Sequence, residues 1–140
     1  MPYLLDSQTV IQIILEHYPE AQAIYVFGSV IADNLRPDSD IDLALLLPHE
    51  IAKKQDNLSM ISIKYALEHY LQREVDLINI RQVATVFQYV IINQAKIIYC
   101  ADEFMRNTFE MLVWSFYQKL NEERAAILEE FFKTGKAYAV

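Results

Sequence analysis

Two aspartates open a strongly apolar stretch of the chain. Asp40 and Asp42 stand in "DIDLALLL", residues 40–47, where all the remaining residues are Ile, Leu or Ala. We expect a strand there, so both side chains point to one face, with α-carbons about 7 Å apart. Like charges held this close beside apolar groups disfavour ionisation unless a cation neutralises them. Because carboxylates are hard oxygen ligands, Mg²⁺ suits this pair better than zinc.

A third aspartate stands in similar surroundings. Asp76 lies between Val75 and Leu77 in "EVDLINI", residues 74–80, which alternates like a strand. Three acids at comparable positions of two strands could surround a pair of metal ions. Two ions about 3.5–4 Å apart clamp the attacking and leaving oxygens of an in-line phosphoryl displacement. The acids therefore indicate phosphoryl-transfer chemistry.

A phosphate-binding segment is also expected. Gly28 and Ser29 directly follow "AQAIYVF", residues 21–27, a short apolar segment that we interpret as a strand. A glycine lets a phosphate approach the backbone N–H groups closely, and the serine adds a hydroxyl. Taken singly, a Gly-Ser pair or an Asp-x-Asp more often forms a turn. Their order along the chain, with Asp76 after them, favours function for the set.

The remaining pattern predicts the elements that position these residues. A first helix begins near Asp6 or Ser7 and stops at Pro19. Further helices are expected over 50–72, 82–94 and 102–134, and strands over 21–27, 40–47, 74–80 and 95–100. The segment 82–94 is compatible with a strand, but its length favours a helix. The last helix is long enough for a break near Asn121, and Gly135 is a candidate for its C-cap.

This order predicts an α+β fold, a small mixed β-sheet with helices packed on it. At 140 residues and 54% apolar composition, we expect a single domain over 1–140, with a core over 1–100 and a C-terminal helical extension over 101–140. The apolar face of that extension is expected to pack mainly on the core. Trp114 lies roughly opposite this face and would anchor a partner if exposed.

Composition excludes several classes of function. The net charge of −7 repels polyanions, and no basic stripe compensates, so we expect no direct nucleic-acid template. Cys100 is the single cysteine and no His/Cys spacing suggests zinc. Neither a signal sequence nor a long apolar run is visible, so we expect a cytoplasmic protein without a membrane span.

The spacing of the motifs resembles a known family. Gly28 and Ser29 are followed by ten residues, 30–39, and then by Asp40-Ile41-Asp42. This pattern, with the flanking "YVFGS" and "RPDSDIDLALL", resembles the minimal (MNT) branch of the DNA polymerase beta nucleotidyltransferase superfamily. Asp76 matches the third acid of that branch. The total length and the helical tail resemble MNT antitoxins, which are paired with HEPN ribonuclease toxins.

The resemblance implies a protein adenylyltransferase that transfers AMP from ATP to a tyrosine hydroxyl of a HEPN toxin and so neutralises the toxin. Two Mg²⁺ ions would be the cofactor of this transfer. Asp40 and Asp42 would hold the metals and the triphosphate. Asp76 would bind the second metal and help to deprotonate the acceptor hydroxyl. Gly28 and Ser29 would hold the β- and γ-phosphates. The toxin would be a partner in a hetero-oligomer.

Two alternatives remain open at this point. The chain could be a non-catalytic antitoxin that blocks its toxin by direct binding, or a nucleotidyltransferase acting on a small molecule. One departure from the family pattern bears on the nucleotide: many members carry a basic residue and then glycine where this chain has Ala32 and Asp33.

Overall fold

A four-stranded mixed sheet forms the centre of the protein. The computed structural model describes residues 7–28, 40–55 and 60–134. The strands are β1 (Ala23–Phe27), β2 (Ile41–Leu46), β3 (Val75–Asn79) and β4 (Lys96–Cys100), in the spatial order β3-β2-β1-β4. β1 runs antiparallel to both β2 and β4, whereas β2 and β3 are parallel. All four strands lie where the sequence predicts them.

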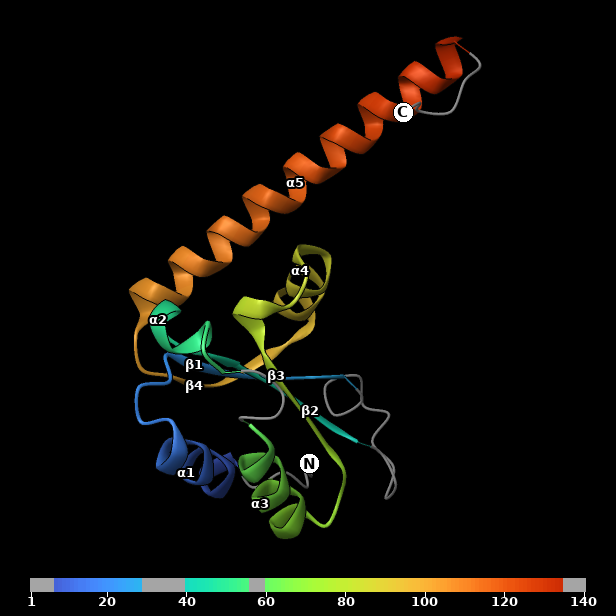
Figure 1. The fold of residues 1–140 in the computed structure, drawn as a ribbon. Coiled ribbons are helices and arrows are strands. Elements are labelled where there is room, and N and C mark those ends of the chain that lie inside the picture. Colours follow the sequence, from blue (N-terminus) through green and yellow to red (C-terminus); the bar gives the residue numbers. More distant parts are fainter. Residues whose placement is uncertain (1–6, 29–39, 56–59, 135–140) are drawn as a thin grey trace.

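Helices cover both faces of this sheet (Figure 1). They are α1 (Ser7–His17), α2 (His49–Ala52), α3 (Ile61–Leu71), α4 (Thr85–Gln94) and α5 (Glu103–Thr134), with a short 3₁₀ turn, η2 (Ile80–Gln82). α1 and α3 lie against one face, and α4 and the start of α5 lie against the other (Figure 1). The predicted α+β fold with a C-terminal helical extension is confirmed. No helix of the described ranges is long and apolar enough to cross a membrane.

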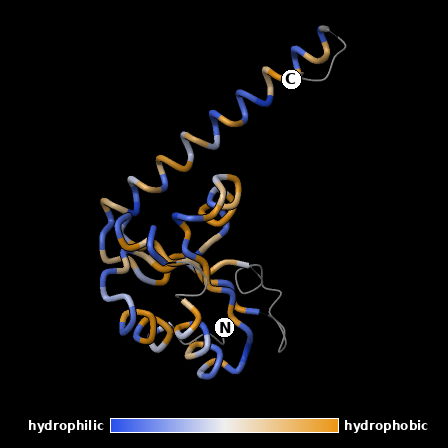
Figure 2. The backbone as a smooth tube through the Cα atoms, viewed as in Figure 1, coloured by the Kyte–Doolittle hydropathy of each residue, from blue (hydrophilic) through white to orange (hydrophobic). Residues whose placement is uncertain are grey.

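Two apolar clusters form on the two faces of β1 and β2. One cluster joins α1 and α3 to the sheet, and its fully buried members include Val10, Ile14, Ile24, Leu43, Leu45, Ile63 and Leu67. The other joins α4 and α5 to the opposite face through Ala23, Tyr25, Ala44, Leu46, Ile91, Phe109 and Val113. Figure 2 shows this apolar colour concentrated in the sheet and in the helix faces turned toward it. The two central strands are therefore rigidly held from both sides.

The prediction of one helix over 50–72 is wrong. α2 ends at Ala52 and α3 begins only at Ile61. The buried Asn79 side chain explains the end of α2, because its Nδ2 donates hydrogen bonds to the backbone oxygens of Ala52, at 2.8 Å, and Gln55, at 3.0 Å. Those oxygens are then engaged by β3 rather than by a following helical turn. Residues 56–59 lie outside the described ranges.

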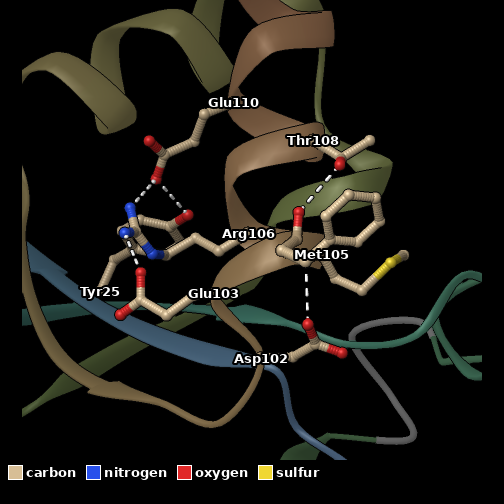
Figure 3. Close-up of polar contacts among 8 residues, drawn as sticks. Tyr25, Asp102, Glu103, Met105, Arg106, Thr108 and Glu110 are labelled. Atoms are coloured by element: carbon tan, nitrogen blue, oxygen red, sulfur yellow. Dashed lines mark hydrogen bonds and ion pairs between the residues drawn. The ribbon is translucent and has the colours of Figure 1, made fainter.

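Polar contacts fix the start of α5 on β1 (Figure 3). The Tyr25 hydroxyl donates to Glu110 Oε2 at 2.8 Å, and Arg106 Nη1 donates to the same oxygen at 3.0 Å. Arg106 Nη2 reaches Glu103 Oε1 at 2.9 Å. Burial raises the pKa of the Tyr25 hydroxyl, and the hydrogen bond to Glu110 raises it further. Tyr25 therefore remains a neutral donor and locates the first turns of α5.

The rest of α5 extends away from the body of the protein (Figure 1). The helix is continuous over 32 residues, about 48 Å at 1.5 Å per residue, so it has no break near Asn121. Of the expected core face, Phe109 and Val113 are buried, but Leu112 is 50% exposed and Phe116 55% exposed. The expectation that this face packs mainly on the core is wrong beyond Val113. Gly135 lies outside the described ranges.

We predict that the two ends of α5 contribute unequally to stability. Phe109→Ala should lower the free energy of unfolding by about 3–5 kcal/mol, because it leaves a cavity in the core. Phe132→Ala, on the same helix but 78% exposed, should change it by less than about 0.5 kcal/mol. Urea unfolding followed by circular dichroism measures both values. Equal losses would contradict the view that only the start of α5 belongs to the core.

Candidate active site

Asp42 and Asp76 lie side by side on the sheet. They are direct partners in the parallel register of β2 and β3, and their carboxyl groups are hydrogen-bonded to each other. Both point to the sheet face that carries Ala44 and Ile78, because residues two apart on a strand share a face. Asp42 is half-buried and Asp76 is exposed. The structure therefore brings together two of the three predicted acids.

The environment of Asp42 opposes its ionisation. Burial raises the pKa of this carboxyl, and the hydrogen bond to Asp76 and the negative charges of Asp76 and Asp40 raise it further, to about 6. A proton shared between the two carboxyl groups reduces the repulsion between their negative charges, and a cation bound between them would do the same. The carboxylate oxygens of this pair are therefore suited to bind a hard cation, which would neutralise their charge.

Gly28 closes the site on the other side of Asp42. Phe27, the last residue of β1, is the register partner of Asp42, so Gly28 leaves the sheet directly beside that carboxylate. Gly28 has a φ of +79°, and a Cβ built on it would overlap Asp42 Oδ2 and lie 2.9 Å from Asp42 Cγ. Only glycine combines this backbone conformation with such a close approach. Gly28 therefore lies beside the acids, and its role in phosphate binding stays a prediction.

Asp40 and Ser29 are the remaining predicted site residues. Asp40 precedes β2 with an exposed side chain, close enough for its charge to affect Asp42 but outside the hydrogen-bonded pair. Across the described part of the chain, no three His, Cys, Asp or Glu side chains form a group ready to hold a metal ion. Ser29, Ala32 and Asp33 lie outside the described ranges. The functional assignments of Asp40, Asp42, Asp76, Gly28 and Ser29 stay predictions.

A cavity of about 570 Å³ adjoins Asp76. It runs along the free edge of β3, between the start of α3 and α4, and is lined by Met60, Ile61, Lys64, Tyr65, Asp76, Leu77, Ile78 and Phe87. Sequence reasoning assigned Tyr65 and Phe87 to the apolar faces of helices. Their side chains are 59% and 39% exposed, and periodicity alone does not distinguish an aromatic residue in a core from one at the rim of a cavity.

The comparison with known proteins identifies the family. The model of the family described as "Polymerase beta, Nucleotidyltransferase" matches residues 9–104, which include β1, β2, β3 and all of the described site. The chain belongs to the polymerase beta nucleotidyltransferase family. The family resemblance inferred from the Gly-Ser and Asp-x-Asp spacing is thereby confirmed.

Among the relatives of this nucleotidyltransferase is the protein adenylyltransferase MntA of Shewanella oneidensis, 29% identical over 135 residues, which cover 96% of this chain and 94% of the relative. A crystal structure of a toxin-antitoxin with AMP-PNP is similar at a TM-score of 0.78 and 28% identity, over 91% of this chain and 99% of that one. A structure of the tri-AMPylated Shewanella oneidensis HEPN toxin in complex with MNT antitoxin is similar at a TM-score of 0.70 and 27% identity, over 90% and 95%.

Gly28→Ala should damage the site and the fold together. A side chain at this positive φ costs about 1–3 kcal/mol of stability, and the new methyl group would push the Asp42 carboxylate away. Chemical denaturation and a crystal structure of the variant test both effects. Gln72→Gly is a matched control, since Gln72 has a φ of 57° and should tolerate glycine within about 1 kcal/mol. An unshifted Asp42 in the Gly28 variant would contradict the contact.

The raised pKa of Asp42 predicts a pH-dependent effect of Asp42→Asn on stability. A folded-state pKa of about 6 exceeds the ordinary 3.8, so the folded protein binds this proton more tightly than the unfolded chain. The stability that the group contributes is present below about pH 4 and is lost as the pH rises through about 6. In the presence of EDTA, Asp42→Asn should therefore stabilise the protein at about pH 7 and lose that advantage at about pH 4.

Urea unfolding of both proteins across this pH range measures the difference. Glu122→Gln, at an exposed position on α5, serves as the control for replacing one carboxyl group by an amide away from the acid pair. A constant difference for Asp42→Asn would show that the acid pair does not share a proton.

Proposed function

We propose that this nucleotidyltransferase is a magnesium-dependent protein adenylyltransferase that transfers AMP from ATP to a tyrosine hydroxyl of a HEPN toxin and so neutralises it. The observation that carries the proposal is the contact of Asp42 with Asp76 on one side and with the Gly28 backbone on the other. Relatives of nearly the same length, one named protein adenylyltransferase MntA and one in complex with an AMPylated HEPN toxin, support this substrate class.

Each residue of the site has a role in this reaction. Asp42 and Asp76 would hold magnesium, and Asp40, two residues before Asp42 and just outside β2, would complete the ligand set. Two bound Mg²⁺ ions would neutralise the charge that develops on the triphosphate. Gly28 and Ser29 would receive the β- and γ-phosphates through backbone N–H groups and the serine hydroxyl. Asp76 would accept the proton of the acceptor hydroxyl.

Charge and organisation are consistent with a protein acceptor. The net charge of −7 disfavours a nucleic-acid template, whereas a single nucleotide can be held by metal ions and a few N–H groups. We propose one domain over 1–140, with the nucleotidyltransferase core over 1–100 and the helical extension over 101–140. The use of ATP agrees with the expected cytoplasmic location.

A second candidate function, neutralisation by contact alone, is favoured by α5. This helix carries exposed apolar side chains, among them Leu112, Trp114, Phe116 and Phe132 at 48–78% exposure. Such side chains are usually covered by a partner. Trp114 also packs edge-on against Tyr89, at 4.9 Å between ring centroids, so its ring is already oriented for contact. An antitoxin could bind its toxin through this surface without chemistry.

A labelling experiment distinguishes the two candidates. The purified chain, the HEPN toxin encoded beside it, ATP and Mg²⁺ should give toxin heavier by one or more AMP units in intact-mass spectra. Asp42→Ala and Asp76→Ala should each lower the rate by about 10²–10⁴-fold, because several kcal/mol of transition-state stabilisation is lost with the metal. EDTA should have the same effect.

The double variant Asp40→Ala with Asp42→Ala decides what neutralises the toxin in cells. Loss of protection with retained binding of toxin supports the transferase. Full protection by the double variant would support neutralisation by contact through α5. Glu122→Gln, remote from the site, controls for expression.

A further inference from the structure

The cavity beside Asp76 lies opposite the proposed phosphate site. Across the sheet the order is Gly28 at the end of β1, Asp42 on β2, Asp76 on β3 and then the cavity at the edge of β3. Among the described strands β3 lies at the edge of the sheet, so none of them separates Asp76 from this cavity. The two acids thus stand between a backbone suited to phosphates and an open apolar space.

In-line displacement requires this kind of separation. The attacking oxygen and the leaving oxygen lie on opposite sides of the phosphorus. If the β- and γ-phosphates leave on the Gly28 side of Asp42, the attacking hydroxyl arrives from the Asp76 side. The cavity lies on that side, and Asp76, which lines it, is the acid positioned to receive the proton.

The lining of the cavity suits an aromatic side chain better than a charged one. Six of its eight lining residues are apolar or aromatic without a charge, with Tyr65 on α3 and Phe87 on α4 across the β3 edge from each other. Phe87 is held by an edge contact with Phe27, at 6.2 Å between ring centroids. Aromatic rings bind well between such groups, while the exposed Asp76 supplies a polar atom at one end.

The α3 wall of the cavity is tied to the strand that carries the acid. Glu68 Oε2 accepts a hydrogen bond from the backbone N–H of Val75 at 2.9 Å and lies 3.6 Å from Lys64 Nζ. Val75 directly precedes Asp76, so this carboxylate sets the distance between α3 and the start of β3. Tyr65, one residue after Lys64, is therefore held at a fixed place relative to Asp76.

We propose that this cavity is the acceptor subsite, in which the ring of the toxin's tyrosine lies between Tyr65 and Phe87 with its hydroxyl at Asp76. The inference rests on the proposed function. The hydroxyl oxygen forms a bond to the α-phosphorus of ATP, and the bond from that phosphorus to the oxygen bridging to the β-phosphate breaks. Pyrophosphate leaves with the electron pair, and the hydroxyl proton passes to the Asp76 carboxylate. Tyr65 is a positioning and specificity-determining residue in this scheme.

Steady-state kinetics with Tyr65→Ala test the subsite. The variant should raise KM for the toxin about 10–100-fold and leave the affinity for AMP-PNP within about twofold, by calorimetry in the presence of Mg²⁺. Tyr65→Phe should restore most of the loss, because the ring rather than the hydroxyl makes the contact. Tyr70→Ala, at a 43% exposed tyrosine of the same helix outside the cavity lining, should leave both values unchanged.

Two results would overturn the proposal. An unchanged KM for the toxin in Tyr65→Ala would show that the acceptor binds elsewhere. A parallel loss of AMP-PNP affinity would show that the cavity holds the nucleotide base instead. Thermal unfolding of each variant controls for folding, which an exposed position on α3 should affect little.

Crosslinking separates this inference from the proposed function. A photoreactive benzoylphenylalanine replaces Tyr65 or Tyr70 in chain already carrying Asp42→Ala, so that no AMP transfer is needed. Irradiation of the complex should link position 65, and not position 70, to a tyrosine-containing peptide of the toxin. If wild-type chain fails to label the toxin but this crosslink forms, the transferase proposal fails and the acceptor role of the cavity fails with it, although the cavity still contacts the toxin. A crosslink absent at 65, or equal at both positions, would refute the subsite itself.

Discussion

The contact between the Asp42 and Asp76 carboxyl groups is the constraint around which the site is organised. The parallel register of β2 and β3 places these two acids directly opposite each other, and their repulsion would separate them on a flexible segment. The separation is prevented because the flanking residues, Leu43 and Val75 among them, are buried. Apolar burial on both faces of the central strands thus opposes an unfavourable electrostatic contact. The cost of that contact in the free protein is what a bound cation would remove.

A single strand, β1, links the three regions to which we assign a function. Its end carries Gly28 beside Asp42, and three residues earlier Tyr25 donates to Glu110 of α5. Phe27 lies between them and contacts Phe87 at the cavity. The placement of the proposed phosphate site, the proposed acceptor cavity and the projecting helix therefore depends on one fully buried segment. A displacement of β1 would disturb all three, which is a physical reason for both of its faces to be packed.

The sequence predicts the strands and the family well, because both depend on local pattern. Alternation of apolar residues locates β3, and the spacing from Gly28 to Asp42 indicates the family. It does not predict the end of α2, which depends on Asn79 reaching the backbone oxygens of Ala52 and Gln55 from 27 and 24 residues away. It also does not separate Asp40 from Asp42. Strand alternation puts both on one face, but only Asp42 has Asp76 as its register partner, and that pairing comes from the topology of the sheet.

The arrangement of the site also bears on how donor and acceptor are brought together. Gly28 and the cavity lie on opposite sides of the acid pair, so the nucleotide and the acceptor would bind to different residues on the two sides. Asp42 is the more buried acid and contacts the Gly28 backbone, whereas Asp76 is exposed and lines the cavity. In the proposed reaction the two carboxylates, although chemically alike, would have different tasks because of their surroundings, Asp42 toward the phosphates and Asp76 toward the incoming hydroxyl. Because a proton on Asp42 and a bound cation relieve the same repulsion, cation binding should accompany the loss of that proton.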